Sequence, residues 1–397
     1  MTRSVSSAAV KLGLIVCVCV TALRAQSIEA LTPNVFERAS EKLRLSIREL
    51  GAGDTVRYPR ATNADGTWKT IAITDWTSGF FPGCLWYMYE YSKDPFFRSA
   101  AEKWTEHLES NQYYTGNHDI GFMIFNSFGN GYRLTKNPAY KQVIMQAAQT
   151  ALKRYNPRLG VIKSWDNPMW QYPVIIDNMM NLELLFWAVK EGADSSLYRA
   201  AMSHAEHTMA NQFRPDGSTF HVVNYDTSDG RVLGRHTAQG YADTSVWARG
   251  QAWAIYGFTM AYRFTNDRRF LATAERAAEY FIGHLPADHI PYWDFKAPSI
   301  PNEPRDASSA AIAANGLLEL STYTKSKDAQ RRYRENAEAM IRALCQFPYS
   351  TEGSASRGLT LHSVTSKPAN AEVDVTLIYA DYYLLEALLK YPHLIRK

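Results

Sequence analysis

An internal recurrence is the strongest constraint on the fold. Six segments of this 397-residue chain each begin with an aspartate and continue as an apolar stretch rich in small residues. Most are followed by a short polar break and then by a second helical pattern with one charged face. Self-similarity of this kind indicates a repeat architecture. The six segments begin at Asp75, Asp119, Asp177, Asp243, Asp306 and Asp374.

The two kinds of helix predict where each will lie. A helix that is apolar all round is buried, whereas a helix with one charged face covers the core and meets water on its other side. Residues 98–108 and 331–344 show the second pattern, and residues 34–50 supply the first of six such partners. We therefore expect an all-α fold, an (α/α)6 barrel, with short strands only in loops such as residues 219–224.

Such a barrel gathers its loops at one end. The inner helices run in the same direction, so their N-termini meet at one mouth, and helix N-termini favour an anionic ligand. Long loops on one side of a rigid scaffold usually carry function. The longest non-helical stretches precede inner helices and should line this mouth: residues 156–172, 214–241, 284–305 and 348–371.

Residues 1–25 predict a secretory signal peptide, which is removed from the mature chain. Arg3 and Lys11 are basic, and residues 12–20 form an apolar run that is too short to span a bilayer. We expect a single catalytic barrel over residues 26–397, periplasmic or secreted. Removal of the signal lowers the formal net charge from +4 to +1, so neither nucleic acid nor a membrane is an expected partner.

Two of the four cysteines, Cys84 and Cys345, remain in the mature chain. Both lie in helical patterns, so we favour two buried free thiols, with one disulfide between them as the alternative. No cysteine and histidine cluster has the spacing of a zinc site. The oligomeric state, monomer or dimer, stays open.

Asp177 places one carboxyl group inside an apolar run. It follows Val174, Ile175 and Ile176 and precedes Met179. Removing a carboxylate from water is costly unless the group is paired or its pKa rises. Asp177 is therefore either a helix N-cap, a role that aspartate fills well, or an acid whose pKa lies near neutrality.

Asp119 opens the inner helix of the preceding repeat and should face Asp177 across the mouth. Two close carboxyl groups raise the pKa of one of them; two independent caps are the alternative. Arg249 lies in an apolar helix and must pair with an aspartate or with a ligand anion. Trp253 shares its helix face and Trp247 does not, so we expect Arg249 and Trp253 at the pocket.

Two further polar segments have a structural and a functional interpretation. His221 lies in an alternating stretch, where a lone histidine is usually a structural residue. Ser363, Ser366 and Lys367 lie in a polar loop before the last inner helix. This loop is either simply solvated or binds a sulfate or carboxylate through its hydroxyl donors and its cation.

Several motifs, in order along the chain, resemble the unsaturated glucuronyl hydrolases, glycoside hydrolase family 88. The resemblance runs from about Asn34 to the C-terminus, and Phe81 stands where many members have tryptophan. It implies an (α/α)6 barrel that needs no metal or cofactor. The implied substrate is an unsaturated uronyl oligosaccharide of the glycosaminoglycan type, which polysaccharide lyases produce. The motifs are residues 74–83, 118–122, 176–182, 243–257 and 379–386.

The same resemblance implies roles for individual residues. Asp177 matches the catalytic acid and base, and Asp119 matches the second essential aspartate. The segment from Ser363 through Ser366 to Lys367 resembles one that contacts sulfate. The positions that match substrate contacts are Trp76, His118, His221, Gln239, Trp247, Arg249 and Trp253.

The implied reaction is hydration of the C4=C5 vinyl ether of the unsaturated uronate, with Asp177 as the proton donor. The nearest alternative is an unsaturated galacturonyl-rhamnose hydrolase of pectin breakdown, in which we would not expect the motif of residues 118–122. An inverting glycosidase would act on saturated sugars and need a wider gap between its two carboxyl groups. A secreted sugar-binding barrel would use its aspartates only as caps.

Overall fold

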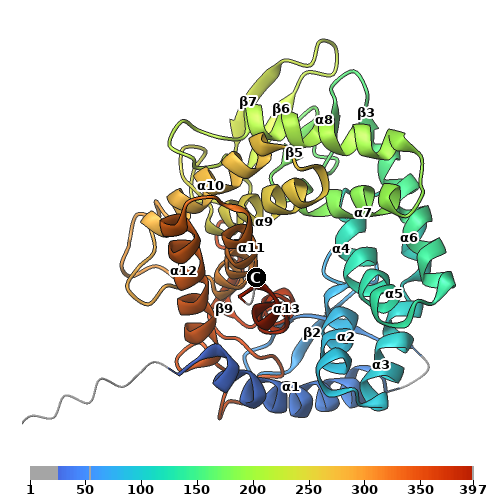
Figure 1. The fold of residues 1–397 in the computed structure, drawn as a ribbon, viewed down its shortest axis with the longest axis vertical. Helices are drawn as coiled ribbons and strands as arrows, with labels where there is room; N and C mark the ends of the chain where they lie inside the picture. Colours follow the sequence, from blue (N-terminus) through green and yellow to red (C-terminus); the bar gives the residue numbers. More distant parts are fainter. Residues whose placement is uncertain (1–25, 53–54, 396–397) are drawn as a thin grey trace, which may run out of the picture.

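The computed structural model, which describes residues 26–52 and 55–395, is an (α/α)6 barrel (Figure 1). The predicted signal peptide, residues 1–25, lies outside the described residues. Neighbouring inner elements contact one another around a closed ring, from α2 to η2 and α5, and from α4 through α7, α9 and α11 to α13 and back to α2. The inner elements are α2 (Phe80–Ser92), α4 (Ile120–Ile124) with η2 (Phe125–Gly129) and α5 (Asn130–Thr135), α7 (Asn178–Lys190), α9 (Ala248–Thr265), α11 (Ala307–Tyr323) and α13 (Ile378–Leu394).

The outer helices begin at the predicted polar breaks. At five of these starts a side chain accepts a hydrogen bond from a backbone N–H of the first turn, and at two of them proline follows the cap, where no N–H partner is needed. These caps are Asp94, Asn137, Asp194, Asp267 and Ser326. The outer helices are α1 (Ile28–Leu50), α3 (Pro95–Glu106), α6 (Pro138–Ala151), α8 (Ser195–Asn211), α10 (Arg268–Gly283) and α12 (Lys327–Cys345).

The prediction that all six repeated aspartates begin inner helices is wrong for three of them. Asp75 and Asp243 lie well before α2 and α9, and Asp374 lies in a strand. In each case the chain first makes a turn or a β-bridge and only then enters the helix. Asp306 is a true N-cap, since its carboxylate accepts a hydrogen bond from the backbone N–H of Ser308.

Glycines let the inner helices around α7 approach closely. A Cβ atom added at Gly257 of α9 would lie 2.5 Å from Cβ of Met179, and one added at Gly121 of α4 would lie 2.5 Å from Oδ1 of Asn181. Side chains at these positions would push α4 and α9 away from α7. The two glycines therefore help to hold the start of α7, and with it Asp177, against both neighbours.

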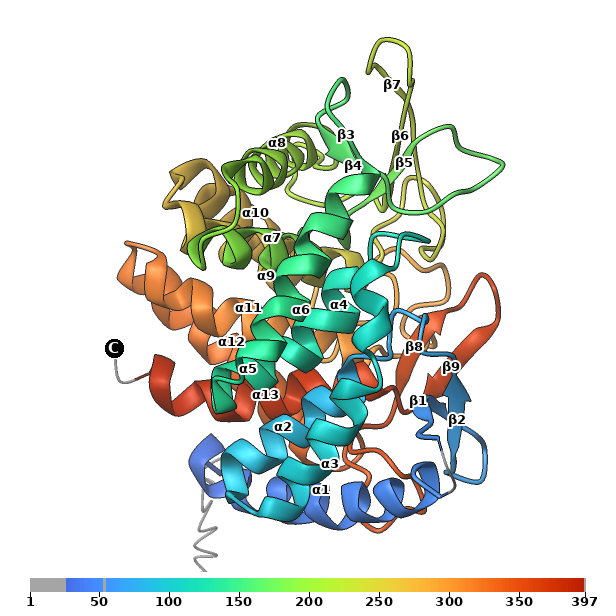
Figure 2. The ribbon, with the colours of Figure 1, turned by 90° about the vertical axis from the view of Figure 1, so that its right-hand side faces the viewer.

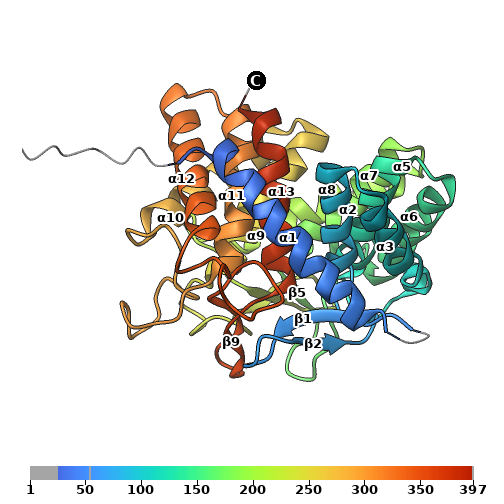
Figure 3. The same ribbon diagram turned by 90° about the horizontal axis from the view of Figure 1, so that it is seen from below.

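All the short strands lie at the end of the barrel where the inner helices begin (Figures 2 and 3). The long loops thus gather at one mouth, as predicted. The strands are β1 (Tyr58–Thr62), β2 (Trp68–Ile71), β3 (Tyr155–Asn156), β4 (Val161–Ile162), β5 (Pro173–Ile175), β6 (Val222–Tyr225), β7 (Val232–His236), β8 (Ser363–Ser366) and β9 (Ala371–Val375).

Both cysteines of the described chain lie in the helical core. Cys84 and Cys345 are both buried free thiols, as predicted. None of the helices in residues 26–52 and 55–395 is long and apolar enough to cross a membrane.

Candidate active site

Asp177 lies at the start of α7 but does not cap it. Its side chain makes no hydrogen bond to the backbone of the first turn, so the N-cap interpretation is wrong. Atom Oδ2 is buried and has no hydrogen-bond partner among the described residues. Burial raises the pKa of Asp177 to about 7, against the lowering effect of Arg249. Near neutral pH the protonated and the ionised forms of this carboxyl group therefore differ little in free energy.

Asp119 lies at the start of α4, and it too makes no cap hydrogen bond. Burial raises its pKa well above the ordinary value, and the nearby charges of Asp177 and Asp75 raise it further. The structure therefore couples the two carboxyl groups, as predicted from the repeat. Burial, however, is the largest cause of both shifts, and repulsion between the two acids contributes only to the shift of Asp119.

Each of these acids has a histidine beside it with a defined tautomer. Nδ1 of His221 accepts hydrogen bonds from the backbone N–H groups of Ala238 and Gln239, so the ring proton must lie on Nε2, 3.8 Å from Oδ2 of Asp177. Nδ1 of His118 lies 3.3 Å from the amide nitrogen of Asn181, and its Nε2 lies 3.3 Å from Oδ1 of Asp119. Burial lowers the pKa of both histidines, to about 3 for His221, so both rings are neutral.

Strand pairing explains why His221 and Asp177 meet. Ile175 of β5 pairs with Val222 of β6, and the N–H of Ile176 donates to the carbonyl of His221. Asp177 directly follows Ile176, so this pairing brings it beside His221, although 44 positions separate the two residues in the sequence. His221 thus lies beside the carboxyl group of Asp177.

Arg249 pairs with an aspartate of the protein, so its guanidinium group is not left free to bind a ligand anion. Its guanidinium group donates to Asp306 at 3.1 Å and to the backbone carbonyls of Val364 and Thr365 in β8, and its side chain is 1% exposed. The guanidinium therefore holds β8 against α9 and α11. Its charge still acts on the pocket, because it lowers the pKa of Asp177.

The prediction that Trp247 is turned away from Arg249 is wrong. It precedes the first turn of α9 in an extended conformation, so helical spacing does not describe where it points. Its ring lies 4.5 Å from the ring of His221, and the guanidinium of Arg249 lies 4.6 Å from its centre. Trp247 thus belongs with these residues and is not turned away from them.

The other two predicted tryptophans lie on an aromatic wall. Trp253 is fully buried and packs 5.4 Å from Phe122, and its indole N–H has no hydrogen-bond partner among the described residues. Trp76 is half-buried and packs 5.5 Å from Phe122 and 4.9 Å from Tyr379. Trp76 is therefore the one with surface left for a sugar ring.

The segment predicted as a polar loop is a strand followed by a turn. Ser363 and Ser366 are the ends of β8 and are buried, and Lys367 begins the turn to β9. The Oγ of Ser363 has no hydrogen-bond partner in the described chain. Gln239 reaches the same strand, because its amide donates to the carbonyl of Thr365 at 2.8 Å. Strand β8 thus links Gln239 and Arg249 to the serines.

Trp165 is a candidate site residue that the sequence analysis missed. Its half-buried ring lies 6.4 Å from both His118 and His221, and its backbone pairs with Asn117. It lies in the first of the long loops expected at the mouth. An aromatic residue in that loop was the sequence feature that could have indicated a site residue. Asn181, one turn into α7, was missed as well; its amide oxygen accepts from the N–H of Phe122.

The site uses carboxyl, imidazole and aromatic groups. No group of three or more His, Cys, Asp or Glu in the described residues is arranged to hold a metal ion. A carboxyl group with a pKa near 7, beside a neutral N–H donor and aromatic surfaces, suits general acid–base chemistry on a sugar.

The fold and this pair of acids define a glycoside hydrolase of the α/α-barrel class. Residues 53–346 match Glycosyl Hydrolase Family 88, and the chain belongs to that family. It is 45% identical over 347 residues to an unsaturated glucuronyl hydrolase of Formosa agariphila, with 86% of each chain covered. It is 33% identical to an unsaturated chondroitin disaccharide hydrolase of Streptococcus agalactiae, with 90% of each chain covered.

Solved structures agree with the sequence relatives. The crystal structure of an unsaturated glucuronyl hydrolase specific for heparin superposes with a TM-score of 0.87 at 42% identity, over 92% of this chain and 98% of that one. A mutant of the Streptococcus agalactiae unsaturated glucuronyl hydrolase, in complex with dGlcA-GalNAc6S, superposes with a TM-score of 0.80 at 31% identity, over 93% of each chain.

Proposed function

We propose that this enzyme removes the 4,5-unsaturated uronic acid from the non-reducing end of lyase-generated glycosaminoglycan-type oligosaccharides, by hydration of the C4=C5 vinyl ether. The observation that carries the proposal is the carboxyl group of Asp177, whose pKa burial raises to about 7. The names of the relatives, which include glucuronyl and chondroitin disaccharide hydrolases, support the class of substrate.

The reaction needs one group that first gives a proton and then takes one. Protonated Asp177 donates its proton to C4, and positive charge develops on C5 and the ring oxygen. The resulting carboxylate accepts a proton from water while the water oxygen bonds to C5. The hemiketal formed at C5 then opens, and the glycosidic bond is lost. A pKa near the working pH lets the same carboxyl group serve both steps.

The neighbouring residues support this cycle in different ways. The neutral Nε2–H of His221 faces Asp177 and is placed to stabilise its ionised form after the first transfer. Asp119, whose pKa burial and the charge of Asp177 raise, is placed to hydrogen-bond sugar hydroxyls. The half-buried rings of Trp76 and Trp165 offer surfaces for the sugar.

The destination of the enzyme is part of the proposal. The basic and apolar pattern of residues 1–25 supports export, to the periplasm or the medium. Lyase products of extracellular polysaccharides would reach the enzyme there. Cell fractionation with detection of the mature N-terminus tests this; full-length protein found only in the cytosol would contradict export.

The activity is tested by replacing Asp177 with asparagine. Hydration removes the C4=C5 double bond, so turnover is followed as loss of its ultraviolet absorbance. We expect Asp177→Asn to lower kcat by at least about 10²–10⁴-fold, the range for general acid–base catalysis, with an unchanged circular dichroism spectrum. Unsaturated disaccharides from chondroitin, hyaluronan and heparin, and unsaturated galacturonyl-rhamnose, serve as substrates. Near-normal turnover by the variant would refute the role of Asp177, and turnover of the pectin product alone would refute the substrate class.

A further inference from the structure

A second cavity of about 550 Å³ lies at the end of the barrel where the inner helices finish. We call it the rear cavity. Its walls come mainly from the C-terminal halves of inner helices, and its inner end reaches Phe122 of α4 and Met180 of α7. The wall residues of the C-terminal halves include Glu90 of α2, Trp187 of α7, Arg263 of α9, Tyr323 of α11 and Lys390 of α13. Its volume falls in the range of small-molecule sites, about 300–1,000 Å³.

An aromatic partition separates the rear cavity from the active site. Phe122 and Tyr383 line the rear cavity. The ring centre of Trp253 lies 5.4 Å from that of Phe122 and 5.6 Å from that of Tyr383, and Trp253 is the member of this layer next to Asp177. Phe80 belongs to the same layer, because its ring centre lies 5.5 Å from that of Phe122 and 5.9 Å from that of Tyr383. A ligand in the rear cavity therefore does not compete for the space beside Asp177.

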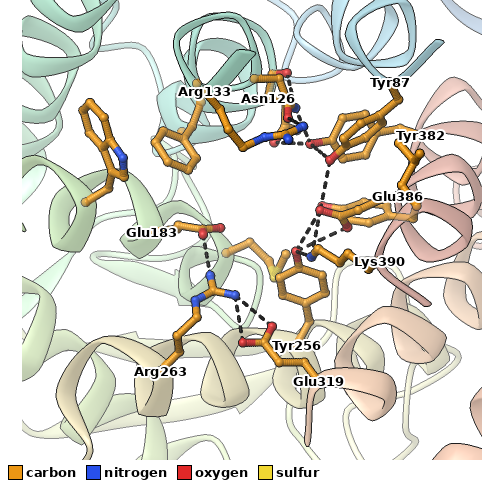
Figure 4. A pocket seen from close by; sticks show the side chains of 18 of the residues that line it. Tyr87, Asn126, Arg133, Glu183, Tyr256, Arg263, Glu319, Tyr382, Glu386 and Lys390 are labelled. Atoms are coloured by element: carbon orange, nitrogen blue, oxygen red, sulfur yellow. Dashed lines mark hydrogen bonds and ion pairs between the residues drawn. The ribbon is translucent and has the colours of Figure 1, made fainter. Parts of the chain in front are cut away.

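Most of the charged groups that line the rear cavity are paired within the protein (Figure 4). Lys136 has no ion pair among the described residues and lies 5.2 Å from the ring centre of Tyr132. Arg263 bonds Glu319 at 2.8 Å and also bonds Glu183, and Lys390 bonds Glu386 at 2.9 Å. Basic residues are favoured here because helix C-termini carry partial negative charge. An ionic ligand beside Arg263 or Lys390 would have to compete with an existing pair, whereas the hydroxyl groups of an uncharged ligand can bond to the edges of these pairs.

A break in the helical hydrogen bonding lies in the wall of the rear cavity. Residues Phe125–Gly129 form a π-helical turn between α4 and α5, and such turns frequently occur at functional sites. Asn126 of this turn lines the cavity, and its amide oxygen accepts from the hydroxyl of Tyr382 at 3.3 Å. Its Nδ2 group is buried and has no partner in the described chain. An unpaired buried donor of this kind is rare in native structures and calls for an explanation.

The same turn supplies an aromatic surface. Phe125 and Tyr132 pack edge-on against Trp187, with ring centres 5.7 Å and 5.6 Å apart, and all three rings are only partly buried. Aromatic faces beside carboxylates, a guanidinium and an amide donor are the groups that bind sugar C–H faces and hydroxyls. We propose that the rear cavity binds an uncharged sugar, a mono- or disaccharide, independently of the active site.

The test measures sugar binding by saturation-transfer NMR, with N-acetylglucosamine and glucose as probes. All proteins carry Asp177→Asn, so that turnover does not interfere. The background protein should bind a probe at millimolar concentration. Trp187→Ala should abolish the signal, and Trp165→Ala, which removes a tryptophan of similar exposure at the other mouth, should leave it unchanged.

A second variant keeps the test valid if loss of Trp187 disturbs the fold. Asn126→Asp keeps the acceptor for the hydroxyl of Tyr382 but removes the unpaired amide donor. We expect it to weaken probe binding at least threefold, and an unfolding scan shows that the variant is folded at the temperature of the binding measurement. No binding of either probe to the background protein would overturn the proposal. Binding that survives both rear-cavity variants, or that is lost with Trp165→Ala, would overturn it too.

Discussion

Nε2 of His221 lies 3.8 Å from Oδ2 of Asp177, and neither atom has a hydrogen-bond partner among the residues that the structure describes. The distance is too long for a hydrogen bond and short enough to become one after a small movement. Because Nδ1 of His221 accepts two backbone N–H groups, the ring can only offer a proton to the acid. The arrangement favours the carboxylate once Asp177 has given up its proton.

The first prediction is the pH dependence of activity. The reaction needs protonated Asp177 in its first step, and the pKa of this group is about 7. We therefore expect kcat/KM to fall as the pH rises through about 7, by about tenfold per pH unit above it. His221→Ala should shift this limb to higher pH, because it removes an N–H donor that favours the ionised acid. A flat profile between pH 6 and about 9 would contradict the assignment.

The second prediction concerns the stability of the Asp177→Asn variant. The pKa of Asp177 is about 7 in the folded protein against an ordinary value of 3.8, so ionisation opposes folding. The cost appears as the pH rises through the window between these values and is complete above about 7. Asp177→Asn should therefore be more stable than the native protein at pH 8, by on the order of 1–4 kcal/mol, and equally stable near pH 4. Urea unfolding at both pH values measures this; a variant that is less stable at pH 8 would contradict it.

The third prediction separates a buried ion pair from an exposed one. Arg249→Ala leaves the carboxylate of Asp306 buried and without its cation, which should cost about 3–5 kcal/mol of stability and release β8. Arg98→Ala breaks the exposed pair with Glu102 and should cost less than about 1 kcal/mol. Chemical denaturation measures the loss in the free energy of unfolding for both variants. Similar losses would contradict the prediction that the buried pair of Arg249 matters more for stability than the exposed pair of Arg98.

The fourth prediction tests the close approach of α9 to α7. Gly257→Ala places a Cβ atom 2.5 Å from Cβ of Met179, so it should cost about 1–3 kcal/mol and lower activity by shifting the start of α7. Gly283→Ala is the matched control, because a Cβ atom there meets nothing within 4 Å. Unfolding and kinetic assays of the pair test this; equal behaviour of the two variants would refute the packing argument.

Much of the site could be predicted because its acids follow the repeat. Asp119 and Asp177 lie at the starts of consecutive inner helices, so counting repeats placed them together. Arg249 and Trp247 were harder. The partner of Arg249 lies in α11 and β8, and the chain at Trp247 leaves helical geometry, so the spacing within one helix carried no information about either.

The sequence by itself determined the barrel, the outer-helix caps and the mouth at which the loops gather. These properties follow from local periodicity and from capping residues that act within a few positions of the chain. Only the tertiary structure decided that Asp177 is an uncapped acid, that His221 faces it, that Trp165 lies between the two histidines and that a rear cavity exists. Burial and long-range contacts set those properties, because the pKa of a carboxyl group depends on residues far away in the sequence that remove it from water.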